Sequence, residues 1–101
     1  MDSKEMFWIA ALHWWRNKPK IVLDFFGQNP PIADTFTATV VTINGDTITF
    51  KNESTGEDKP VNFLGTEMRL ASYDPEDSTS AFVALWEDGL ESVKCVMTEK
   101  R

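Results

Sequence analysis

Turn-forming residues divide this chain, from Pro19 onward, into short runs that are typical of β-strands. Gly27 and the Asn29-Pro30-Pro31 break close the first run, while Asn44-Gly45 and Asp88-Gly89 are dipeptides typical of tight hairpins. The runs between them are rich in Val, Ile, Thr and Phe, often in alternation with polar residues. Such runs favour strands with one face buried. The pattern therefore predicts antiparallel β-structure over most of the chain.

The segment before Pro19 predicts a helix instead. Asp2 is a suitable N-terminal cap, with Glu5 three residues later to reach back to it. From Met6 to Trp15 nearly every residue is apolar, and Lys18 and Pro19 end the run because a residue before proline avoids helical geometry. We expect a helix over about residues 3–17, followed by a β-body over about residues 20–98.

Two hairpins can be placed in register from their turns. A two-residue turn at Asn44-Gly45 pairs Val41 with Ile48, and a bulge at the Val40-Val41 step then brings the apolar residues of both strands to one face. A turn at Asp88-Gly89 pairs Trp86 with Glu91. This second hairpin has one face that is largely apolar, from Phe82 to Met97.

The reverse face of the last hairpin is apolar as well. It carries Ala81, Val83 and Leu85. We therefore expect this strand to be covered on both sides, with the N-terminal helix as one of the covers.

These elements predict a mainly β (α+β) fold: an N-terminal helix followed by a strongly bent antiparallel sheet or a small barrel, of SH3-like or Sm-like size, with five to seven short strands. The length of 101 residues fits a single domain over residues 1–101. Four Trp and seven Phe supply large apolar area for the core of so small a domain.

The charge balance argues against partners that are themselves strongly anionic. Ten basic and sixteen acidic residues give a net charge of −6, which disfavours binding to nucleic-acid phosphates or anionic membranes. The one basic cluster is Arg16, Lys18 and Lys20. A single cysteine and an N-terminus without the layout of a signal peptide indicate a cytoplasmic protein.

No motif predicts catalysis or a bound metal or cofactor. His13 is the sole histidine, which excludes a histidine-based triad or a His-rich metal site within one chain. Cys95 lies on the inward face of the last hairpin, where a thiol is usually unreactive. Asp24 interrupts an apolar strand and is either a semi-buried carboxylate or, as we favour, part of a solvated face. Asp74, Glu76 and Asp77 are too few, and wrongly spaced, for a calcium loop.

The aromatic helix is the unusual feature of the sequence. Its apolar residues surround more than half of its circumference, so either the β-body wraps it deeply or part of it meets another molecule. The expected contact residues are Trp8, Trp14, Trp15 and Arg16. The first functional hypothesis is a non-enzymatic protein-interaction module that self-associates or binds a partner protein through this helix, with an acidic inhibitor that mimics nucleic acid as a variant. The alternatives are a small-barrel protein that binds single-stranded nucleic acid, and a carboxylate-based enzyme or small-ligand binder.

Overall fold

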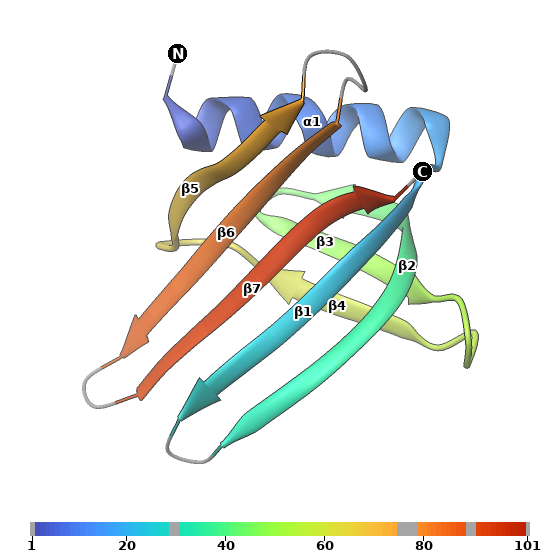
Figure 1. Cartoon of the computed structure of the whole chain (residues 1–101). Coiled ribbons are helices and arrows are strands. Elements are labelled where there is room, and N and C mark those ends of the chain that lie inside the picture. Colours follow the sequence, from blue (N-terminus) through green and yellow to red (C-terminus); the bar gives the residue numbers. More distant parts are fainter. Residues whose placement is uncertain (1, 29–30, 75–78, 89–90, 101) are drawn as a thin grey trace.

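One helix and seven strands make up the part of the chain that the computed structural model describes, residues 2–28, 31–74, 79–88 and 91–100 (Figure 1). The elements are α1 (Ser3–Asn17), β1 (Lys20–Gln28), β2 (Ile32–Asn44), β3 (Thr47–Asn52), β4 (Asp58–Asn62), β5 (Glu67–Asp74), β6 (Thr79–Asp88) and β7 (Glu91–Lys100). The strands form one antiparallel sheet in the order β4-β3-β2-β1-β7-β6-β5. The predicted class, mainly β with an N-terminal helix, is confirmed. The sheet is strongly bent but not closed, with β4 and β5 as its edges.

The concave face of the bent sheet holds the core. In β1, Ile21, Leu23 and Phe25 are buried while the intervening residues are partly exposed, as strict alternation requires. α1 lies across one open end of the sheet and packs against β2 and β5 (Figure 1). Phe7 and Trp14 of the helix each approach the Phe82 ring edge-on, at centroid distances of 5.5 and 6.2 Å. The helix is therefore part of the core and not an appendage to it.

The turn between β2 and β3 differs from the predicted one by one residue. Asn44 still belongs to β2 and pairs with the first residue of β3, so Gly45-Asp46 forms the turn. The predicted pairing of Val41 with Ile48 is therefore wrong. Gly45 has a φ of 60°, and a glycine in the first position of a two-residue hairpin turn is typical of type II′. The predicted turn Asn44-Gly45 and the observed turn Gly45-Asp46 share Gly45. The glycine therefore indicates a hairpin here but does not decide between the two turns.

The predicted bulge in β2 is present. Val40 pairs with Phe50 and Thr42 with Thr49, which leaves Val41 as the extra residue. The carbonyl oxygen of Val40 accepts a hydrogen bond of 2.6 Å from Nζ of Lys18. The bulge therefore turns the apolar residues of β2 inward and also provides an acceptor for the residue that ends α1.

Replacement of Lys18 by methionine is expected to lower the free energy of unfolding by about 1–2 kcal/mol, because a charge-assisted bond to a partly buried carbonyl is lost. Lys20→Met is the matched control. Its ammonium pairs at 2.6 Å with Glu53 on the surface, where such a pair contributes less than about 1 kcal/mol. Urea unfolding measures both variants, and equal losses would contradict a special role of Lys18.

The register of the hairpin between β6 and β7 differs from the predicted one by two residues. Trp86 pairs with Val93, not Glu91, and Ala84 pairs with Cys95. A shift of two residues returns every side chain to the same face. The apolar face was therefore correctly predicted although its pairing was wrong, and Ala84 and Cys95 are wholly buried. Residues 89–90, which include Gly89 of the predicted turn, lie outside the described residues.

The convex face of β6 is not covered by the helix. Val83 and Leu85 point away from the concave face that α1 packs against, and both are half-buried. Val83 is paired with Val96 of β7, which is also half-buried. Ala81, on the same face, is buried, so within the described residues the expected cover on both sides of this strand is complete on the concave side and partial on the convex side.

Candidate protein-interaction face

Contacts to the β-body hold α1 near both of its ends. Oδ1 of Asp2 accepts the N–H of Glu5 at 2.8 Å, as predicted for the N-terminal cap. Nζ of Lys4 donates to the carbonyl of Thr66, in the connection from β4 to β5, at 3.3 Å. At the other end, Lys18 has a left-handed backbone (φ 54°) that closes the helix, and its side chain binds the β2 bulge. Both ends of α1 are therefore anchored to the body.

The inner side of α1 consists of Phe7, Ala11 and Trp14, which are wholly buried. Their spacing of i, i+4 and i+7 places them on one side of the helix. Trp14 was among the expected contact residues, and this expectation is corrected. Its ring has no exposed surface because it is enclosed by the concave face of the sheet, beside Phe82.

Large apolar side chains are exposed outside this inner side, Ile9 and Leu12 opposite it and Trp15 on its flank. Ile9 is 54% exposed, Leu12 41% and Trp15 40%. In a helix with 3.6 residues per turn, Ile9 and Leu12 lie far around the axis from the buried residues. We define the outer helix face by the following residues of α1: Glu5, Trp8, Ile9, Leu12, Trp15 and Arg16.

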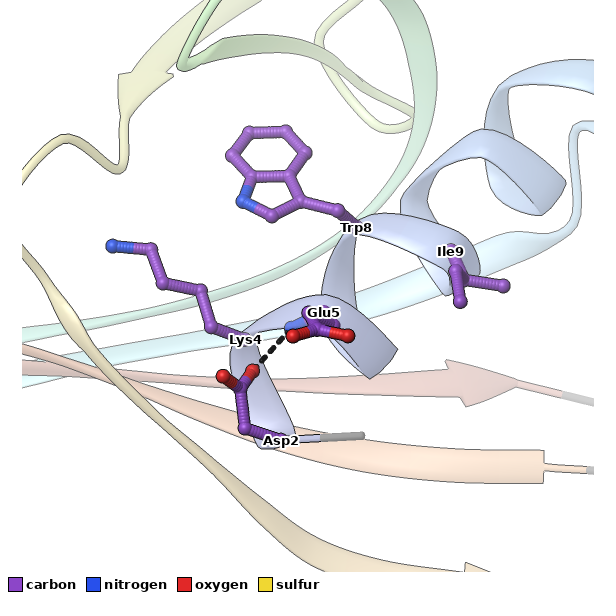
Figure 2. A pocket seen from close by; sticks show the side chains of 5 residues that line it. All are labelled: Asp2, Lys4, Glu5, Trp8 and Ile9. Carbon is purple, nitrogen blue, oxygen red and sulfur yellow. Dashed lines mark hydrogen bonds between the residues drawn. The ribbon is translucent and has the colours of Figure 1, made fainter.

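Trp8 lies at the edge of the outer helix face that borders the β-body. It is half-buried, edge-on to Phe7 at 5.2 Å and to Phe63 at 6.2 Å between ring centroids. An open depression of about 490 Å³ lies beside it. Figure 2 shows the lining side chains, with Lys4 and Trp8 extending toward the same side of the helix and Ile9 at the far side. One part of the Trp8 ring therefore packs against Phe7 and Phe63, and another part is accessible from the depression.

The structure brings three of the four expected contact residues to one surface. Trp8, Trp15 and Arg16 belong to the outer helix face, whereas Trp14 does not. Sequence reasoning missed Ile9 and Leu12 as contact candidates. A helical wheel that assigns Phe7, Ala11 and Trp14 to the core would have found them, but the sequence alone does not show which apolar stripe is the inner one.

Cys95 and His13, the sole cysteine and the sole histidine, do not meet in the structure. Cys95 is wholly buried in the sheet, and this burial, more than the nearby Asp24 carboxylate, raises the pKa of its thiol from 9.0 to about 12. His13 is exposed on α1, with its Nδ1 3.0 Å from Nδ2 of Asn17. A protonated thiol inside the core and an imidazole at the surface do not form a catalytic pair.

Asp24 lies on the convex face of β1, the side away from the buried Ile21, Leu23 and Phe25. Its Oδ1 accepts the hydroxyl of Thr35 at 2.8 Å, and the residue is half-buried. Among the described residues, no group of three or more His, Cys, Asp or Glu side chains could hold a metal ion. Of the acidic segment 74–78, residues 75–78 lie outside the described residues.

A second depression of about 300 Å³ lies on the body, between β1, β4, β6 and β7, and is lined by Phe25, Lys59, Pro60, Val61, Asn62, Trp86 and Val93. Its polar groups already have partners. Nζ of Lys59 lies 4.7 Å from the centre of the Phe25 ring, and the indole N–H of Trp86 donates to the carbonyl of Asn62 at 3.0 Å. This depression therefore offers an apolar surface with few free polar groups to orient a small ligand.

The comparisons with other proteins give no family. Neither protein-family models, nor curated proteins, nor solved structures yield a match to this chain. In the described part of the chain, no helix has the length and apolar character needed to cross a membrane.

Proposed function

We propose that this chain is a non-enzymatic protein-interaction module that binds another protein chain through the outer helix face. The observation that carries the proposal is the exposure of Ile9, Leu12 and Trp15 on a helix whose opposite side already completes the core. These side chains are not needed to fill the fold. Grouped large apolar residues on a surface are typical of contact sites between proteins.

The mechanism is the docking of a rigid amphipathic helix against an apolar surface of its partner. The contacts of Lys4 and Lys18 hold the helix on the β-body before binding, so little conformational freedom is lost on association. Tryptophan and arginine are the residue types that most often dominate such contacts. Trp15 and Arg16 supply both at the C-terminal end of the outer helix face.

The basic cluster gives little support to the nucleic-acid alternative. Lys18 is bound to the carbonyl of Val40, and Lys20 is paired with Glu53 at 2.6 Å. Arg16 is then the one member of the cluster for which the structure gives no such contact. A single cation does not make the charged groove that single-stranded nucleic acid requires.

The acidic-mimic variant also has little support from the described side chains. Glu53 lies beside Lys20 after β3, while Glu67 lies at the start of β5 and is paired with Arg69 at 2.9 Å. Glu57 and Asp58 are exposed and line one depression together with Asp34, so the described carboxylates make one small acidic group near β3 and β4, with Glu67 apart from it, and not a continuous acidic face. The side chains of several other acidic residues, among them Glu87, Asp88 and Glu91, lie outside the described part of the chain.

Photo-crosslinking in the cells that produce the protein tests the proposal directly. A photoreactive phenylalanine analogue is placed at Leu12, at the centre of the outer helix face, and in a matched variant at Lys51, which is exposed on β3. We expect a discrete protein adduct from position 12 and none from position 51. Mass spectrometry identifies the crosslinked chain, whether it is a copy of this protein or another one.

A double variant provides the specificity control. Ile9→Gln with Trp15→Gln removes two exposed apolar side chains and leaves the core untouched. It is expected to abolish the adduct from position 12 while circular dichroism shows the same folded state. An adduct that is equal from positions 12 and 51, or no adduct from position 12, would refute the proposed function.

A further inference from the structure

Four residues of the outer helix face form a line whose spacing is the same in both directions along α1 and whose two ends carry opposite charges. Glu5, Ile9, Leu12 and Arg16 follow at i, i+4, i+7 and i+11. This spacing keeps them on one side of the helix. That side lies opposite Phe7, Ala11 and Trp14 in the core. The line begins with an acid, ends with a base and has two aliphatic residues between them.

We infer that the occupant of the outer helix face is a second copy of this chain, whose α1 packs antiparallel against the first about a twofold axis. The inference rests on the proposed function and names its partner. When Glu5 lies opposite Arg16 of the second copy, Ile9 lies opposite Leu12 of that copy, and the twofold axis repeats both contacts. Such a self-complementary patch is what a symmetric dimer requires.

The charges select the antiparallel arrangement over the parallel one. A parallel pair would place Glu5 against Glu5 and Arg16 against Arg16, and like charges at these positions oppose association. The antiparallel pair converts both into opposite-charge contacts. In either arrangement the two β-bodies lie on the far sides of the helix pair, so the charges at Glu5 and Arg16 make the difference.

The tryptophans of the flank fit the same arrangement. Trp8 and Trp15 are two helical turns apart and lie on the same side of the line that Ile9 and Leu12 follow. A twofold axis perpendicular to the plane of the two helices places the tryptophan flanks of both copies on the same side of that plane. Trp8 of one copy therefore lies beside Trp15 of the other, at nearly the same height along the helix axes, and the apolar contact extends beyond the central line.

The size of the contact predicts a weak dimer. A helix of 15 residues presents less surface than the roughly 800 Å² per partner of a standard interface. We therefore expect a dissociation constant in the micromolar range, with a solution mass that rises from one toward two chains of 11.5 kDa as the concentration increases. Light scattering over a concentration series measures this mass.

The decisive experiment mixes two charge-reversed variants. Glu5→Arg places arginine opposite Arg16 of a second copy, and Arg16→Glu places glutamate opposite Glu5. Each variant alone is expected to dimerise about tenfold more weakly than the parent, because each carries two repulsive contacts per dimer. Their mixture restores both opposite-charge contacts and is expected to form the heterodimer with an affinity near that of the parent. Lys51→Glu, with the same charge change as Arg16→Glu but outside the face, is the control for net charge.

Each outcome decides between the arrangements. A parent chain that stays monomeric across the series refutes the second copy as occupant, and the crosslink from position 12 then tells independently whether another protein binds there. A dimer that the charge reversals leave unchanged, or that the mixture does not restore, refutes the antiparallel register. Because recovery in the mixture requires both variants to be folded, misfolding cannot imitate the expected result.

Discussion

Trp14→Ala is expected to lower the free energy of unfolding by about 3–5 kcal/mol, the range for loss of a large aromatic side chain from a packed core. Trp14 has no exposed surface and lies edge-on to Phe7 and Phe82, at centroid distances of 6.1 and 6.2 Å. Small domains have total stabilities of only about 5–15 kcal/mol. The variant is therefore expected to be near the limit of folding, and urea unfolding at low protein concentration measures the loss.

Trp15→Ala is the matched control, one residue further along the same helix. Its side chain is 40% exposed, and the expected loss in the monomer is less than about 1 kcal/mol. Trp14→Phe keeps most of the ring and gives a folded intermediate case if Trp14→Ala does not fold. Equal losses at positions 14 and 15 would contradict the assignment of Trp14 to the core and Trp15 to the surface.

This contrast marks the limit of what the sequence of the helix could predict. The N-terminal cap and the end of the helix depend on local chemistry, that of Asp2 and of Lys18 before Pro19, and both were predictable. The choice between Trp14 and Trp15 depends on which side of the helix meets the sheet. That side is set by the long-range packing of Phe7 and Trp14 against Phe63 and Phe82 of the body, which has no local signal.

The hairpins show the same division between local and long-range information. Burial on alternate residues predicted the inward faces of β6 and β7 correctly, and it also required the bulge at Val41. The pairing partners were wrong because a turn dipeptide locates a hairpin only to within one or two residues. A shift of two residues preserves the buried face, so hydrophobic pattern alone cannot correct an error such as the pairing of Trp86 with Glu91 instead of Val93.

The buried thiol of Cys95 is expected to make stability fall with rising pH above pH 9. Burial, and secondly the Asp24 carboxylate, raises the pKa of the thiol from 9.0 to about 12 in the folded chain. Below pH 9 the thiol is protonated in both states and contributes no pH dependence. Between pH 9 and 12 the unfolded chain loses the proton and the folded chain keeps it, so the free energy of unfolding falls by about 1.4 kcal/mol per pH unit.

Comparison with Cys95→Ala isolates this contribution, because tyrosine and lysine side chains titrate in both proteins and cancel in the difference. The difference in the free energy of unfolding between the parent and Cys95→Ala is expected to be constant below pH 9. By pH 11 the parent is expected to have lost about 3 kcal/mol relative to the variant. Asp24→Asn is expected to keep most of the slope, because burial is the larger cause and the carboxylate the smaller. Parallel curves for parent and Cys95→Ala up to pH 11 would mean that the thiol ionises in the folded chain, and that the concave face around it is open to water.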